Sequence, residues 1–149
     1  MGGFLLLLGI LLASGPKPEK KDVPYLVHTN SLVETEIIKP GAAEAAAGTV
    51  YSVPGESSPA RTPLALPVFL LDASGIQPQT PRLIRLTSKA GHREAIVLKK
   101  PDPNDAQILL TVTNLGAGLY RFEVVNEIEN GEYALIAPGS PLLFCFTVF

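Results

Sequence analysis

Short stretches of alternating or continuous apolar residues, separated by turn-forming residues, run through this chain from residue 25 to its end. Ile108, Leu110 and Val112 occupy alternate positions, as expected where every second side chain points to the same face of a sheet. Residues 32–38 show the same period of two, and the pattern as a whole predicts β-strands. The predicted strands are Tyr25–His28, Leu32–Ile38, Thr49–Val53, Leu66–Leu71, Arg82–Ser88, Glu94–Lys99, Gln107–Asn114, Leu119–Val125, Tyr133–Ala137 and Leu142–Val148.

Three segments rich in proline or glycine separate predicted strands and are interpreted as loops. They are residues 52–63, 74–81 and 100–105. Proline lacks the N–H that a central strand needs, and glycine permits tight turns. The segment Pro40–Ala47, rich in alanine and ended by Gly48, predicts one helix of about two turns.

The segment before the predicted strand at Tyr133 carries a recognisable spacing. Ile128, Gly131 and Tyr133 stand at its first, fourth and sixth positions. This spacing resembles the tyrosine corner of immunoglobulin-like sandwiches, in which a tyrosine hydroxyl bonds to upstream backbone at a crossing between the sheets. The resemblance implies an all-β, immunoglobulin-like β-sandwich of about seven to nine short antiparallel strands. An ordinary Asn-Gly hairpin that joins Phe122–Val125 to Tyr133–Ile136 is the alternative.

An uncharged apolar run from Phe4 to Ala13 lies near the N-terminus. Its length matches the hydrophobic region of a signal peptide and falls short of the roughly 20 residues that cross a bilayer as a helix. No Lys or Arg precedes the run, and basic residues follow it, which departs from the usual order of charges. We expect a cleavable signal peptide here, with a buried core helix at residues 4–13 as the alternative.

An export signal divides the chain into three parts. We expect residues 1–15 to be the signal peptide, residues 16–22 a flexible tether and residues 23–149 the β-sandwich domain. The processed protein would then be periplasmic or extracellular and would not span a membrane. Because Cys145 is the only cysteine, no disulfide can form within the chain, and packing must hold the fold even in an oxidising compartment.

Four short segments resemble parts of small uncharacterised exported bacterial proteins with an immunoglobulin-like β-sandwich. The segments are Val23–His28, Leu32–Glu36, Gly131–Leu135 and Phe144–Phe146. These segments are structural in character, so the resemblance implies no catalytic residue.

Charge is unevenly distributed, although the net charge is only −2. This balance gives no field that would attract nucleic acid or an anionic membrane, so we expect no nucleic-acid partner. Residues 82–100 hold six basic residues and one acid, whereas residues 123–132 hold four acids and no base. Either the two stretches pair with each other, or the basic one faces an acidic partner such as an envelope protein or polysaccharide. The candidate binding surface comprises Arg82, Arg85, Lys89 and Arg93.

Residues suited to catalysis are scarce. His28 and His92 are the only histidines, and no Gly-x-Ser-x-Gly motif is present. The chain also lacks zinc-ligand spacing and a glycine-rich phosphate loop. We therefore expect no catalytic, cofactor-binding or metal-binding residue.

These observations favour a non-enzymatic binding, adaptor or structural module of the cell envelope. The loops at residues 52–67 and 74–81 are its predicted contact surfaces, since binding residues concentrate on loops. A small secreted hydrolase that uses His28 or His92 is one alternative. A small outer-membrane β-barrel is another, because residues 142–149 are apolar on both faces, although a buried sandwich strand is the favoured interpretation of this end.

Overall fold

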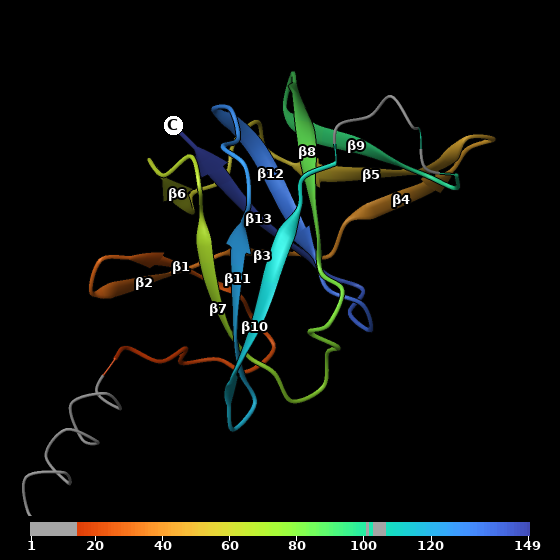
Figure 1. The fold of residues 1–149 in the computed structure, drawn as a ribbon. Helices are drawn as coiled ribbons and strands as arrows, with labels where there is room; N and C mark the ends of the chain where they lie inside the picture. The colour runs from red at the N-terminus through yellow and green to blue at the C-terminus, as the bar shows by residue number, and fades with distance from the viewer. Residues whose placement is uncertain (1–14, 101, 103–106) are drawn as a thin grey trace, which may run out of the picture.

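The computed structural model describes residues 15–100, 102 and 107–149, and this part of the chain forms thirteen β-strands and no helix. The strands make two sheets, shown in Figure 1. The order in the first sheet is β10 (Leu110–Gly116), β11 (Leu119–Val124), β7 (Val68–Asp72), β1 (Tyr25–His28) and β2 (Ser31–Glu34). The order in the second is β3 (Glu36–Ile38), β13 (Leu143–Val148), β12 (Gly131–Ile136), β8 (Arg82–Lys89), β9 (His92–Leu98), β5 (Gly48–Pro54) and β4 (Gly41–Glu44).

Neighbouring strands in both sheets are antiparallel, apart from the two-residue strand β6 (Arg61–Thr62), which pairs with β13 in parallel. The all-β prediction is confirmed, and each of the predicted strands overlaps an observed one. The predicted number of strands was too low, for reasons given below. Residues 1–14 of the predicted signal peptide lie outside the described residues.

The predicted strand at residues 32–38 is two strands in different sheets. β2 pairs with β1, whereas β3 pairs with β13. The chain changes sheets at Thr35, whose N–H and hydroxyl both donate hydrogen bonds to the Pro24 carbonyl, at 3.3 and 2.7 Å. Thr35 is buried, and these bonds satisfy its polar groups where the ladder is interrupted.

The predicted helix at Pro40–Ala47 is wrong, because residues 41–44 form the edge strand β4. A two-turn helix with no apolar face gains too little to offset the cost of nucleation, whereas β5 offers backbone partners along its edge. Ala45 and Gly48 exchange backbone hydrogen bonds to close the hairpin. Glycine is required at position 48, because a Cβ there would collide with the Val97 carbonyl.

The predicted loop at residues 52–63 is also partly wrong. Its first residues belong to β5, and it contains β6, which lies beside β13. Ser58 and Ala60 are buried, and the Thr147 N–H donates to the Ala60 carbonyl at 2.8 Å. The prolines keep this segment out of the centre of a sheet, but they do not prevent β6 from pairing with β13. The segment therefore docks against the second sheet through its buried residues, whereas others, such as Ser57, stay exposed.

One apolar core fills the space between the sheets. Phe69 of β7 and Phe122 of β11 enter it from the first sheet, and Phe146 of β13 and Tyr133 of β12 enter it from the second. The rings of Phe69 and Phe146 meet edge to face with centroids 5.2 Å apart, and those of Tyr133 and Phe146 stack at 5.7 Å. Such offset and edge contacts are the favoured geometries of aromatic pairs.

The strands β12 and β13 are covered on their opposite face as well. Ala134, Leu143 and Cys145 form a second cluster there with Val53 of β5 and Leu86 of β8. Every residue of β13 is consequently buried, which explains why its sequence is apolar on both faces.

The connection from β11 to β12 crosses from one sheet to the other, so the alternative of an Asn-Gly hairpin between these strands is wrong. At the end of the crossing, the Tyr133 hydroxyl donates a hydrogen bond of 2.7 Å to the Glu129 carbonyl. Ile128 packs against the core between the sheets, and its N–H donates to the Ala65 carbonyl at 2.9 Å. Gly131 begins β12, close beneath the Arg85 guanidinium. These contacts fix where the chain enters β12.

Candidate functional site

The strands β8 and β9 form a hairpin that opens into a fork. They pair only through Thr87–Lys89 and His92–Glu94, on either side of a two-residue turn. Gly91 in that turn has a φ of +81°, which glycine adopts without strain. Away from the turn, Arg82–Leu86 of β8 pair with β12, whereas β9 stays paired with β5. Figure 1 shows the two strands diverging.

The diverging strands and β10 bound a groove of about 870 Å³, which we name the fork groove. β10 is the edge strand of the first sheet, and Ile108, just before it, forms a bridge with Leu83 of β8. The lining residues come from β8, β9, β10 and the segments before β8 and β10. They are Gln79, Thr80, Pro81, Arg82, Leu83, Ile84, Arg85, Thr87, Ala95, Ile96, Val97, Leu98, Lys99, Asp102, Gln107, Ile108, Leu109, Leu110 and Val112.

The fork groove combines exposed apolar side chains with basic ones. Ile96 is 48% exposed and Leu109 is 54% exposed, on two different walls of the groove. Arg82, Arg85 and Lys99 supply positive charge to the same surface. An exposed apolar residue carries little meaning alone, but apolar and basic residues around one concavity are typical of a ligand site.

Of the predicted binding surface, Arg82 and Arg85 line the fork groove, whereas Lys89 and Arg93 do not. Lys89 lies at the hairpin turn, where its ammonium pairs with the Glu94 carboxylate. The sequence prediction missed the apolar walls. Its one signal was Leu109, an apolar residue on the outward-facing side of an alternating strand.

The basic and acidic stretches also pair with each other, as one of the two sequence interpretations proposed. The Arg85 guanidinium donates to Glu129 Oε2 at 2.9 Å and to the Asn130 carbonyl at 3.2 Å. Both side chains of the ion pair are more than half exposed, and surface pairs of this kind contribute little net free energy. Arg85 is therefore held near the groove by a contact that a ligand can replace.

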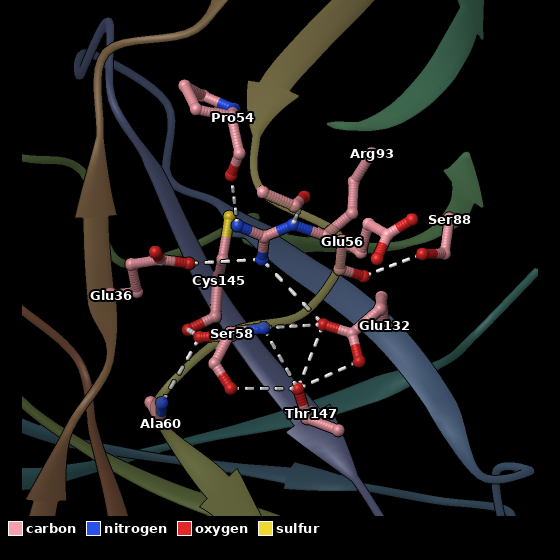
Figure 2. A network of polar contacts seen from close by, with 11 residues as sticks. Glu36, Pro54, Glu56, Ser58, Ala60, Ser88, Arg93, Glu132, Cys145 and Thr147 are labelled. Atoms are coloured by element: carbon pink, nitrogen blue, oxygen red, sulfur yellow. Dashed lines mark hydrogen bonds and ion pairs between the residues drawn. The ribbon is translucent and has the colours of Figure 1, made fainter. Parts of the chain in front are cut away.

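Arg93 is fully buried, so its assignment to a surface was wrong. Figure 2 shows its guanidinium enclosed by backbone and acidic side chains. Nε donates to the Gly55 carbonyl at 2.9 Å and Nη2 to the Pro54 carbonyl at 2.8 Å. Nη1 lies 3.0 Å from Glu36 Oε1, in an ion pair not aligned as a hydrogen bond, and 3.7 Å from Glu132 Oε1. A hydrophobic pattern cannot reveal an arginine that is buried by its ion partners.

The network continues from Glu132 into the segment before β6 (Figure 2). The Ser58 N–H donates to Glu132 Oε1 at 2.8 Å, and the Thr147 hydroxyl lies 2.8 Å from both oxygens of that carboxylate. The Ser58 hydroxyl donates to the Cys145 carbonyl at 3.3 Å. All these groups are buried and bonded to each other, so we interpret the network as a clamp on the sheet and not as a ligand site.

The two histidines of the hydrolase alternative lie in different sheets, His28 in β1 and His92 in β9. His92 Nε2 is 3.2 Å from Glu94 Oε2. The Cys145 thiol is buried, and this burial raises its pKa to about 12, so it stays protonated and is not a nucleophile at neutral pH. Within residues 15–100, 102 and 107–149, no three or more His, Cys, Asp or Glu side chains gather where they can hold a metal ion.

A shallower depression of about 310 Å³ lies between residues 33–37 and Pro59–Ala60. Its two acids already have cationic partners, since Glu34 pairs with Lys20 and Glu36 with Arg93. The fork groove therefore remains the candidate site.

The loop that leads to the groove is anchored by Asp22, the last residue of the predicted tether. Its carboxylate accepts hydrogen bonds from the N–H groups of Ser74, Gly75 and Ile76, at 2.7 to 3.2 Å, and from the Ser74 hydroxyl. Partial burial opposes ionisation, but these bonds together lower the pKa of Asp22 to about 2. The Asp22 N–H also donates to the Asp72 carbonyl, so this residue is joined to the domain.

Comparison with protein families, curated proteins and solved structures finds no match for this chain. In the part of the chain that the structure describes, no helix has the length and apolar character needed to cross a membrane. The interpretation of the fork groove therefore depends on its own geometry and chemistry.

Proposed function

We propose that this protein is an exported, non-enzymatic binding module of the cell envelope, built on an immunoglobulin-like β-sandwich, and that the fork groove takes its acidic ligand. The observation that carries the proposal is one concavity that exposes Ile96, Leu109 and Arg82 together. The buried Arg93 guanidinium already donates to the Gly55 and Pro54 carbonyls and forms an ion pair with Glu36, so its charge is balanced within the fold.

Separate observations support the immunoglobulin-like architecture and export. The crossing between the sheets, with the Tyr133 hydroxyl bonded to upstream backbone, supports the architecture. The apolar run Phe4–Ala13 supports a signal peptide. The lone cysteine, Cys145, is buried with a neutral thiol, which suits a protein in an oxidising compartment.

Fractionation of a diderm host that expresses the full-length chain tests export. We expect a soluble periplasmic or extracellular product whose intact mass lacks roughly the first 15 residues. A full-length product confined to the cytosol would contradict the export half of the proposal.

Co-sedimentation with purified envelope fragments tests the binding half. We expect the wild-type product to sediment with the fragments and the variant Arg82→Glu/Lys99→Glu to stay in the supernatant. The matched control is Lys17→Glu/Lys39→Glu, which reverses two exposed charges away from the groove and should sediment like wild type. Equal sedimentation of all three proteins, or of none, would contradict a groove-mediated interaction.

A further inference from the structure

We propose that the fork groove binds an extended polypeptide segment of alternating acidic and apolar residues, which adds as a strand along the open edge of β9. This inference rests on the proposed function and specifies its ligand. β9 pairs with β5 over its whole length but with β8 only as far as Glu94. Among the described residues, no strand lies on the other side of residues 95–98.

The open edge presents backbone groups at defined positions. Lys89 and His92 flank the two-residue turn, and residues that close such a turn exchange both of their backbone hydrogen bonds. The backbone N–H and C=O groups of His92 therefore point toward β8. Because these groups alternate in direction from one residue to the next, those of Glu94, Ile96 and Leu98 also point toward the side of β8. Glu94 is paired with β8, whereas Ile96 and Leu98 are left for an incoming strand. This is the arrangement used in recognition by strand addition.

Charge selects an acidic segment. Arg82, Arg85 and Lys99 line the groove, and Asp102 is the one acid among the lining residues that the structure describes. Arg85 is 52% exposed and its partner Glu129 is 83% exposed, so a carboxylate of the ligand can take over this weak ion pair. Attraction between an acidic ligand and these basic residues would also raise the rate of association, and this rate should fall as the salt concentration rises.

The apolar walls favour a polypeptide over an acidic polysaccharide. In an added strand, side chains alternate between two directions, so one set can cover Ile96 and Leu109 while the other reaches the basic residues. A polysaccharide carries no regular ladder of N–H and C=O groups for the open edge of β9. An alternating acidic and apolar segment satisfies the backbone, the charges and the exposed apolar surface together.

Fluorescence anisotropy with a labelled, end-capped octapeptide of alternating glutamate and valine tests the inference on the full chain. We expect saturable binding, at least about tenfold weaker binding to Arg82→Glu and Ile96→Asp, and unchanged binding to Lys39→Glu. The same peptide with lysine in place of glutamate should not bind. Far-ultraviolet circular dichroism of each variant establishes that it is folded.

N-methylation of the peptide separates strand addition from simple charge attraction. Methyl groups on one alternate set of backbone nitrogens should abolish binding, whereas those on the other set should leave it nearly intact. Equal binding of both methylated peptides would overturn strand addition. A third outcome is that the protein binds alginate, an acidic polysaccharide, saturably, that Arg82→Glu loses this binding, and that the peptide does not bind. This outcome would keep the groove as a ligand site but would reject a polypeptide ligand. Absence of binding by both probes, together with unchanged envelope sedimentation of the groove variant, would reject both proposals.

Discussion

Arg93 Nη1 lies 3.0 Å from Glu36 Oε1, although their strands β9 and β3 are separated by β13, β12 and β8 in the sheet order. The ion pair therefore joins distant parts of one sheet around its second apolar cluster. Glu132 lies on the path between them and binds both Arg93 and the segment at Ser58. The buried clamp therefore ties β9 and the end of β5 to β3 and β12.

Loss of the buried arginine should strongly destabilise the fold. In Arg93→Met, the acids Glu36 and Glu132 remain in place without their cation, and removal of one partner from a buried ion pair costs roughly 3 to 5 kcal/mol. Urea unfolding measures the free energy of unfolding. The triple variant Arg93→Met/Glu36→Gln/Glu132→Gln should recover part of the loss, and a loss below about 1 kcal/mol for Arg93→Met would contradict the clamp.

The Tyr133 hydroxyl should contribute measurably to stability. Tyr133→Phe removes the 2.7 Å bond to the Glu129 carbonyl but keeps the buried ring, so we expect a loss of about 1 kcal/mol in the free energy of unfolding. Tyr51→Phe is the matched control, because the Tyr51 side chain makes no hydrogen bond within the described residues. Equal urea midpoints for the two variants would contradict a structural role for this hydroxyl.

Stability should fall in acid partly through Asp22. Its pKa is lowered from 3.8 to about 2 in the folded chain, so its contribution is present above pH 3.8 and disappears as pH falls towards 2. The lowering corresponds to at most about 2 kcal/mol. Asp22→Asn keeps a residue type that tolerates the φ of +62° found here. We expect this variant to be less stable at pH 7 and to lose less stability between pH 5 and pH 2; parallel pH profiles for the two proteins would refute the assignment.

The Cys145 thiol should be inert in the folded protein. It is fully buried, and burial raises its pKa to about 12, so almost no thiolate exists at pH 8. A thiol-reactive chromogenic disulfide should label it only after urea unfolding, and non-reducing electrophoresis should show no disulfide-linked dimer. Ser57→Cys, which adds an exposed thiol to the same chain, is the positive control. Rapid labelling of wild type under native conditions would show that Cys145 is accessible.

Local patterns predicted most of the strands because each depends on a short alternation or apolar run. The alternation of Ile108, Leu110 and Val112 predicted the strand that became β10, and the burial of β13 followed from a run that is apolar on both faces. Two local predictions failed where tertiary partners decided the outcome. Residues 41–44 pair with β5, and Thr35 donates a hydrogen bond to the Pro24 carbonyl. Neither partner can be predicted from the neighbouring sequence.

The candidate site was only partly predictable for the same reason. The sequence analysis assigned Arg82, Arg85 and Arg93 alike to a basic surface. Only the positions of Glu36 and Glu132 in the folded chain make burial of Arg93 favourable. Of the groove walls, Ile96 lies in β9 of the second sheet, whereas Leu109 directly precedes β10 of the first sheet. No local pattern reports that two such strands approach each other.

By itself, the sequence determined the all-β class, the positions of most strands and the apolar character of the C-terminal one, because backbone alternation and turn residues act over a few positions. Only the tertiary structure decided which sheet each strand joins, where β8 and β9 diverge and which charges are buried. Those features depend on contacts between residues far apart in the chain, whose free energies exist only once the sheets have assembled.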